Sequence, residues 1–208
     1  MPPASASLVL GTTNAGKLRE LVALLTPLGI ECRSLAGLPA VEVEETGETF
    51  ADNAALKASM QARALTAWVL AEDSGLVVPA LGGAPGVRSA RFSGPLPAGS
   101  TATIDDRNNA LLLERLAGHG GRDRAAHYAC HAALADPAGR ILATAHGTCG
   151  GTIAVAPRGA GGFGYDPLFI VPEYHRTFGE IPPAVKAVIS HRGRALRAII
   201  PAIVRALA

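Results

Sequence analysis

LVLGTTNAGKLRE, from Leu8 to Glu20, predicts a strand, a polar loop and a helix in that order. Residues 8–10 form an apolar run that suits a buried strand. After the loop, apolar residues recur at the helical spacings of three and four, at Leu18, Leu21, Val22, Leu25 and Leu28. Gly29 stands where this helix would end. The polar loop therefore precedes a helix N-terminus, where unpaired N–H groups and the helix dipole favour an anion.

Three interpretations of this loop are open. Gly11, Gly16 and Lys17 match the G-x-x-x-x-G-K spacing of a P-loop, but that motif continues with Ser or Thr, because its hydroxyl binds magnesium. Leu18 stands at that position and has no such ligand. The loop is otherwise an ordinary polar turn, or a different phosphate-binding loop whose metal is held elsewhere. In the last case the donors to phosphate are Thr12, Thr13, Asn14 and Lys17.

Composition limits the class of protein. A chain of 208 residues with 49% hydrophobic residues suits one domain with a sizeable core. The net charge of +2 argues against a nucleic-acid partner. The sequence lacks an apolar segment long enough to span a membrane, so a membrane partner is not expected. The N-terminal segment MPPASASLVL does not look like a signal peptide. Three cysteines without close pairing suggest reduced thiols in the cytoplasm, at Cys32, Cys130 and Cys149.

Two acidic clusters are candidates for chemistry. Glu44, Glu45 and Glu48 precede a helix predicted over residues 50–65 and capped by Thr49, and their ordinary role would be to complement the helix dipole. A buried strand predicted over residues 68–71 ends at Glu72, Asp73, Ser74 and Gly75. Ligands of open α/β sheets bind beyond the carboxyl ends of strands, so this acid pair would suit magnesium. An acidic turn without a metal is the alternative.

The remaining elements are expected from periodicity and turn residues. Strands are predicted over residues 30–35, 76–80, 125–135, 140–148 and 168–171, and a helix over residues 104–117. Val41 and Val43 alternate with glutamates, as in an exposed or edge strand. Residues 175–183 are expected to be a loop. A C-terminal helix is predicted to start after Ser190, with Pro201 kinking or shortening it.

A glycine-rich stretch and a late basic group are further candidates. GAGGFGYDPLF, residues 159–169, offers the faces of Phe163 and Tyr165 for stacking with a base, although a glycine-rich turn with two core aromatics would look the same. His191 and Arg192 stand at the start of the last helix, the unfavourable end for cations. Their placement there suggests an anionic or carbonyl-bearing ligand.

Taken in order, six segments of the chain resemble the inosine triphosphate pyrophosphatases, also called XTP/dITP diphosphohydrolases. The segments are TTNAGK from Thr12, EETGETFADNA from Glu44, AEDSG from Ala71, GGAPGVRSARFSG from Gly82, GGFGYDPLF from Gly161 and SHRG from Ser190. The resemblance implies an α/β fold, with an elongated mixed β-sheet flanked by helices in two lobes around a central nucleotide cleft. It also implies a single pyrophosphatase domain over residues 1–208, a homodimer, and hydrolysis of dITP, ITP or XTP to the monophosphate and pyrophosphate with Mg²⁺.

The resemblance also implies roles for individual residues. The triphosphate would lie on Thr12, Thr13, Asn14, Ala15, Gly16 and Lys17. Asp73 would be the catalytic proton acceptor and, with Glu45, a ligand of Mg²⁺. The other substrate contacts would be Lys57, Ser74, Phe163, Gly164, Tyr165, Asp166, Lys186, His191 and Arg192, of which residues 163–166 line the base pocket and the last two read the base. Two positions depart from the family pattern, Thr13 in place of glycine and Glu72 in place of aspartate.

Three alternative functions remain on the sequence alone. A P-loop kinase or ATPase would act on the γ-phosphate, and Leu18 argues against it. A related house-cleaning pyrophosphatase would prefer dTTP or UTP, whereas the SHR and FGYD segments favour purines. A non-catalytic nucleotide-binding module would not need the acids Glu45 and Asp73.

Overall fold

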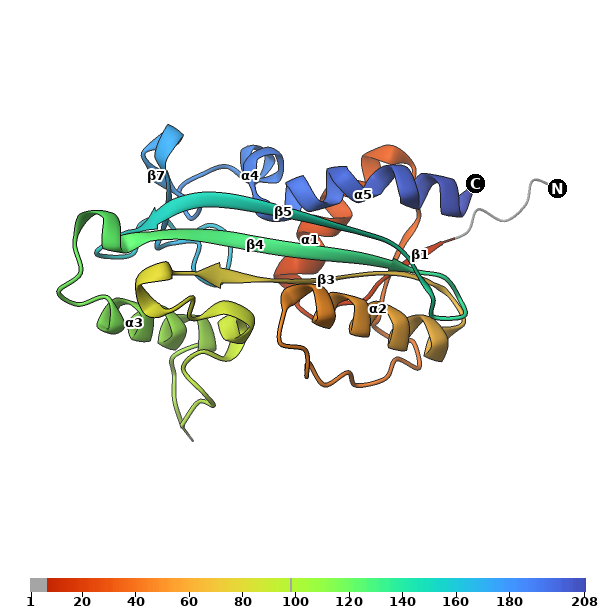
Figure 1. Ribbon diagram of the computed structural model, residues 1–208, viewed down its shortest axis with the longest axis horizontal. Coiled ribbons are helices and arrows are strands. Elements are labelled where there is room, and N and C mark those ends of the chain that lie inside the picture. The colour runs from red at the N-terminus through yellow and green to blue at the C-terminus, as the bar shows by residue number, and fades with distance from the viewer. Residues whose placement is uncertain (1–6, 98) are drawn as a thin grey trace. The chain divides into compact units, whose positions relative to one another are not determined.

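The structure, a computed structural model, describes residues 7–97 and 99–208, which form one mixed seven-stranded sheet with helices (Figure 1). The strands are β1 (Leu8–Leu10), β2 (Cys32–Ser34), β3 (Trp68–Val77), β4 (Ala125–Ala135), β5 (Ile141–Ile153), β6 (Phe169–Val171) and β7 (Arg176–Thr177). The helices are α1 (Ala15–Leu25), α2 (Phe50–Leu65), α3 (Ile104–Arg115), α4 (Pro183–Ile189) and α5 (His191–Leu207). The strand order is β2-β1-β3-β4-β5-β6-β7. Because β1 is parallel to β2 and β3 while β6 is antiparallel to β5 and β7, the predicted mixed α/β sheet is confirmed.

The chain divides into two compact units. Unit 1 holds the chain up to Asp73, with Cys130–Gly147 and His191–Ala208, and unit 2 holds Ser74–Ala129 and Thr148–Ser190. Strands β3, β4 and β5 each contribute residues to both units. None of the helices within the described ranges has the length and apolar character needed to span a membrane.

Unit 1 is built on the alternation of side chains along β1. Leu8 and Leu10 pack in one core cluster with residues of α1 and α5, whereas Val9 packs in a second cluster with alanines of α2. Successive side chains of a strand point to opposite faces, so each face of β1 receives its own helix layer. Figure 1 shows α2 on one side of β1 and β3 and α1 and α5 on the other.

Unit 2 has a separate core that is rich in aromatic residues. The rings of Tyr128 and Phe169 lie 4.8 Å apart, and those of Phe169 and Phe178 lie 5.1 Å apart. Helix α3 adds the fully buried side chain of Leu112, and the chain just beyond the helix adds Leu116. Burial of these large apolar groups holds α3 against the strands of this unit.

A buried arginine ties three chain segments of unit 2 together. The Arg124 guanidinium donates to the carbonyls of Ile153 at 2.7 Å, Ala154 at 2.7 Å and Leu116 at 3.0 Å. All three carbonyl groups would lose a charged donor if this side chain were removed, and a buried acceptor without a partner is costly.

We therefore expect Arg124→Met to lower the free energy of unfolding by about 3 kcal/mol. In a protein of this size that corresponds to an unfolding temperature lower by roughly 10 °C. Calorimetry would measure it, with Arg122→Met as the matched control, because Arg122 lies in the same 3-10 turn and is exposed. Equal unfolding temperatures for the two variants would contradict the anchoring role.

Several predicted elements are confirmed and others are wrong. Helix α2 has the predicted bounds, with the Thr49 hydroxyl accepting from the Asp52 N–H. No strand forms at Val41, because its N–H and C=O bond to the side-chain amide of Gln61 on α2 instead. The two-residue strand β7 lies where a loop was expected, and helix α4, which was not predicted, begins at the last residue of that segment. Helix α5 continues past Pro201 to its end, so the proline does not shorten it.

Candidate active site

The polar loop leads directly into α1, as predicted. The helix begins at Ala15, so Ala15, Gly16 and Lys17 form its first turn rather than part of the loop. The Asn14 side chain caps the helix by accepting from the Lys17 N–H at 2.9 Å, and the Thr12 hydroxyl accepts from the Asn14 N–H at 3.2 Å. The loop side chains thus order the helix N-terminus, where the first N–H groups have no partner within the helix.

The acid pair lies within a strand and not at its end, which corrects the sequence-based expectation. Strand β3 continues to Val77, because Leu76 beyond the acids is fully buried in the core of unit 2. Strand β1 ends at Leu10, which pairs with Leu70. Glu72 and Asp73 therefore lie just beyond the carboxyl end of the neighbouring strand β1. Adjacent residues of a strand face opposite ways, so the two carboxylates have different main partners. Lys17 reaches both, since its Nζ lies 3.2 Å from Glu72 Oε1 and 3.9 Å from Asp73 Oδ1.

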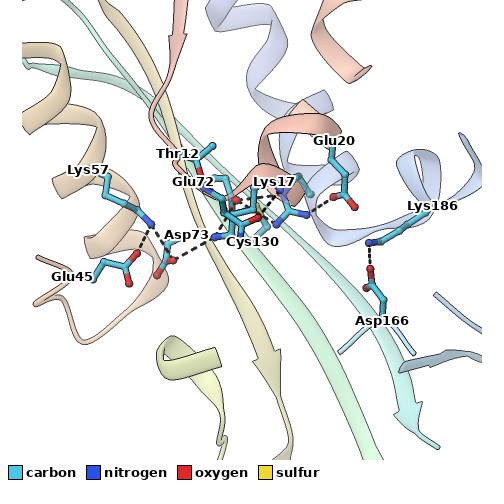
Figure 2. Close-up of polar contacts among 12 residues, drawn as sticks. Thr12, Lys17, Glu20, Glu45, Lys57, Glu72, Asp73, Cys130, Asp166 and Lys186 are labelled. Carbon is cyan, nitrogen blue, oxygen red and sulfur yellow. Dashed lines mark hydrogen bonds and ion pairs between the residues drawn. The ribbon is translucent and has the colours of Figure 1, made fainter. Parts of the chain in front are cut away.

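Asp73 faces α2, where a lysine joins it to a second acid (Figure 2). The Lys57 Nζ lies 3.2 Å from Asp73 Oδ1 and 2.7 Å from Glu45 Oε1. The Asn53 amide donates to Asp73 Oδ2 at 3.1 Å. Asn53 was not predicted as a site residue. It lies one helical turn before Lys57 on the same face of α2, and this spacing in the sequence could have identified it.

Glu72 faces α1 and α5, where it meets two cations. The Lys17 Nζ lies 3.2 Å from Glu72 Oε1, and the Arg192 Nε and Nη2 lie 3.3 Å from the same oxygen. Arg192 Nη1 also donates to Glu20 on α1 (Figure 2). Arg192 is 1% exposed, so this base-reading candidate is buried among acids of its own chain. Glu20 was not predicted, and it lies one turn after Lys17 on α1.

The charges of unit 1 shift the pKa of the central groups. Burial raises the pKa of Asp73, while Lys57 and Lys17 lower it and the nearby glutamates raise it, with a net increase. Burial lowers the pKa of Lys57, but Asp73 and Glu45 outweigh this effect, so it stays charged. A carboxylate beside two lysines would ordinarily be more acidic, and burial is the main cause of the net increase, to which Glu45 and Glu72 add.

The same residues fit a magnesium ion. Glu45 and Asp73 both reach one ammonium group, so their oxygens already converge on a cation, and magnesium prefers one or two carboxylates together with water and substrate phosphates. Among the described residues no three acid, histidine or cysteine side chains already form a ligand group. The fit is therefore to a site with two carboxylate ligands, whose other ligands would be water and phosphate oxygens.

Unit 2 carries the second set of predicted residues. The Lys186 Nζ donates to Asp166 Oδ2 (Figure 2). The same nitrogen lies 4.9 Å from the centre of the Phe163 ring. The Phe163 N–H donates to the same carboxylate oxygen at 2.9 Å. The Tyr165 hydroxyl donates to the Ser89 carbonyl at 2.8 Å, and this side chain is buried. Asp166 thus accepts from both the backbone of the glycine-rich loop and Lys186.

The structure brings the predicted residues into two sets. Unit 1 gathers Lys17, Glu45, Lys57, Asp73 and Arg192. Unit 2 gathers Phe163, Asp166 and Lys186, with Gly164 and Tyr165 in the same loop. His191 begins α5 in unit 1 and is buried, and Ser74 lies half-buried in β3.

Comparison with known proteins identifies the family. A sequence model of the Ham1 family matches residues 8–202. The chain belongs to the Ham1 family. Two curated relatives of this Ham1 protein are both named dITP/XTP pyrophosphatase. The one from Exiguobacterium sp. AT1b is 53% identical over 91% of this chain and 93% of its own length. The one from Rhodopirellula baltica is 50% identical over 95% of this chain and 93% of its own length.

A solved Ham1 structure supports the same assignment. The HAM1 protein of Coxiella burnetii superposes with a TM-score of 0.83 and is 39% identical, and the match covers 96% of this Ham1 chain and 99% of that one. Since sequence and fold agree over nearly the whole length of both chains, the family membership applies to both units.

Proposed function

We propose that this Ham1 protein hydrolyses non-standard purine nucleoside triphosphates, namely dITP, ITP and XTP, to the nucleoside monophosphate and pyrophosphate. The observation that carries the proposal is the convergence of Asp73, Lys17 and Lys57 beside the N-terminus of α1. The names of the two curated relatives support the choice of substrate and reaction.

The proposed mechanism assigns a step to each group of unit 1. The N-terminus of α1 and the Lys17 ammonium bind the triphosphate. Asp73 accepts a proton from the water that attacks the α-phosphorus, and the bond from that phosphorus to the pyrophosphate oxygen breaks. The raised pKa of Asp73 suits the proton transfer. Lys57 holds Asp73 in place and neutralises the charge of the leaving pyrophosphate. Magnesium, held by Glu45 and Asp73 when bound, supplies further positive charge to the phosphates.

Selectivity for the base is proposed to come from two places. The loop of Phe163–Asp166, with Lys186, would line the base pocket, and His191 and Arg192 would read the base. A protein donor can bond to the 6-oxo group of hypoxanthine or xanthine, which is an acceptor. The 6-amino group of adenine is itself a donor, so the same protein group could not bond to it. The unpaired polar groups that result would disfavour ATP and dATP.

The first test is the identity of the products from dITP and from dATP with magnesium. We expect dIMP and pyrophosphate from dITP and little turnover of dATP. Orthophosphate and a nucleoside diphosphate would instead indicate attack on the γ-phosphate, and bound but unchanged nucleotide would indicate a binding module.

Removal of magnesium should abolish turnover. We expect no pyrophosphate release from dITP after the protein is treated with EDTA, because the charge on the phosphates would then lack the neutralising metal. In the ion-pair cluster described above, the cations Lys17, Lys57 and Arg192 are already paired with the carboxylates of Glu20, Glu45, Glu72 and Asp73. Added Mg²⁺ should restore activity and Ca²⁺ should restore less, since Ca²⁺ prefers longer bonds and more ligands. Full activity in EDTA would reject the metal requirement.

The organisation of the protein is also part of the proposal. We propose that residues 1–208 act as a single pyrophosphatase domain, that the chain forms a homodimer, and that it works in the cytoplasm on the free nucleotide pool. Light scattering should then give a mass twice that of the 21.2 kDa chain.

A further inference from the structure

Helix α3 holds the backbone of the glycine-rich loop in unit 2. The Gly164 N–H donates to Asp105 Oδ2 at 2.7 Å, and the Gly164 carbonyl accepts from Asn109 Nδ2 at 3.0 Å. Asp105 and Asn109 are four residues apart and so lie on the same face of α3. Both polar groups of one peptide residue therefore end on the same helix face.

Gly164 is the residue at which such a support matters most. Its φ is +60°, a backbone conformation that glycine adopts readily and other residues rarely. Glycine also reaches many alternative conformations, so a glycine-rich loop needs external bonds to stay in one of them. The hydrogen bond from the Gly164 N–H to Asp105 has a charged acceptor and is therefore stronger than a bond between neutral groups.

The residue beside Asn109 supports a second loop. The buried Asn108 side chain accepts from the Ser93 N–H at 2.8 Å and donates to the carbonyls of Ser89 and Ala90, both at 3.3 Å. The Ser89 carbonyl also accepts from the Tyr165 hydroxyl. Asn108 therefore bonds the GGAPGVRSARFSG segment to α3, and Asn109 bonds the glycine-rich loop to the same helix. The role of the GGAPGVRSARFSG segment is thus to support the glycine-rich loop through Ser89.

We propose that Asp105 and Asn109 are positioning residues that set base specificity by holding Gly164, and through it the loop of Phe163 and Tyr165. This inference rests on the proposed function of that loop. Without the two bonds the loop would sample more conformations and would have to be ordered when the substrate binds. Loss of the two hydrogen bonds should therefore raise KM and lower the preference for dITP over dATP, while kcat changes little.

The chain offers a matched control for this test. Asp106 lies beside Asp105 in the first turn of α3, but its carboxylate accepts from the Thr103 N–H and hydroxyl in a capping box. Asp106→Ala removes the same charge and weakens the same helix without touching Gly164. Asp105→Asn keeps an oxygen acceptor for the Gly164 N–H and serves as the conservative variant.

Steady-state kinetics of Asp105→Ala should show a KM for dITP about tenfold higher than wild type, with kcat within about twofold. Asp105→Asn should recover most of the loss, Asn109→Leu should resemble Asp105→Ala, and Asp106→Ala should keep the wild-type KM with a lower unfolding temperature. A KM unchanged in Asp105→Ala, or raised equally in Asp106→Ala, would overturn the proposal.

Hydrogen exchange of the nucleotide-free protein separates this inference from the proposed function. Peptides covering residues 161–166 should exchange faster in Asp105→Ala than in wild type and Asp106→Ala. If wild type did not hydrolyse dITP, the proposed function and the specificity role would both fail, even if exchange were faster. If wild type hydrolysed dITP but exchange was unchanged in Asp105→Ala, only the positioning role would be overturned.

Discussion

Replacing Asp73 by Asn should lower kcat for dITP by about a thousandfold or more, because it removes both the proton acceptor and a charge that would hold magnesium. The fold should survive, since an asparagine oxygen in place of Oδ1 still accepts from Lys57, although the amide group in place of Oδ2 no longer accepts from Asn53. Single-turnover pyrophosphate release would measure the loss, and the unfolding temperature would report on the fold.

Asp52→Asn is the matched control for this variant. Asp52 is also an aspartate of unit 1, but its side chain is exposed near the start of α2. We expect its kcat to remain within about twofold of wild type, since its carboxylate accepts from the hydroxyl of the cap residue Thr49 and belongs to the helix N-terminus. Turnover of dITP by Asp73→Asn at a wild-type rate would reject Asp73 as the proton acceptor.

Arg192→Ala should have the largest effect on stability and should also test base reading. Its guanidinium is a buried ion-pair partner of Glu72, which is 1% exposed. Without this guanidinium, the Glu72 carboxylate keeps its ion pair with Lys17 but loses the one with Arg192. Loss of one partner of a buried ion pair costs about 3 kcal/mol or more. Denaturant unfolding would measure the stability change, and competition between ITP and ATP would measure the preference.

The two roles of Arg192 predict different results. Arg205→Ala on the exposed face of α5 is the control and should leave both quantities unchanged. Lower stability with an eroded preference for ITP would support both roles. Lower stability with an unchanged preference would assign Arg192 to holding Glu72 and Glu20, and would leave base reading to other groups. Unchanged stability would contradict the buried ion pairs.

Local sequence determined the elements whose signals are contained in neighbouring residues. Helix α2 begins after the Thr49 cap and ends at Leu65 as predicted, because capping and helical periodicity involve residues within a few positions of one another. The order of β1, loop and α1 followed from one stretch for the same reason. The individual motifs also carried the family resemblance, which the Ham1 match confirms.

Tertiary structure decided the features that depend on residues far apart in the chain. Val41 bonds to Gln61 and not to a neighbouring strand. Strand β3 continues past Glu72 and Asp73, because the core of unit 2 buries Leu76 beyond them. A short window of sequence shows only the acids and predicts a strand end there.

The sequence alone identified Lys17, Lys57, Glu45, Asp73 and Arg192 as candidates, but not how they are paired. Arg192 bonds to Glu20 across 172 positions of sequence and to Glu72 across 120. Such pairing depends on which helix packs on which face of the sheet, and the alternation along β1 and β3 sets that arrangement. Local sequence therefore determined the chemistry available to this protein, and the packing of α1, α2 and α5 decided which charges meet, because ion pairs depend on distance in space.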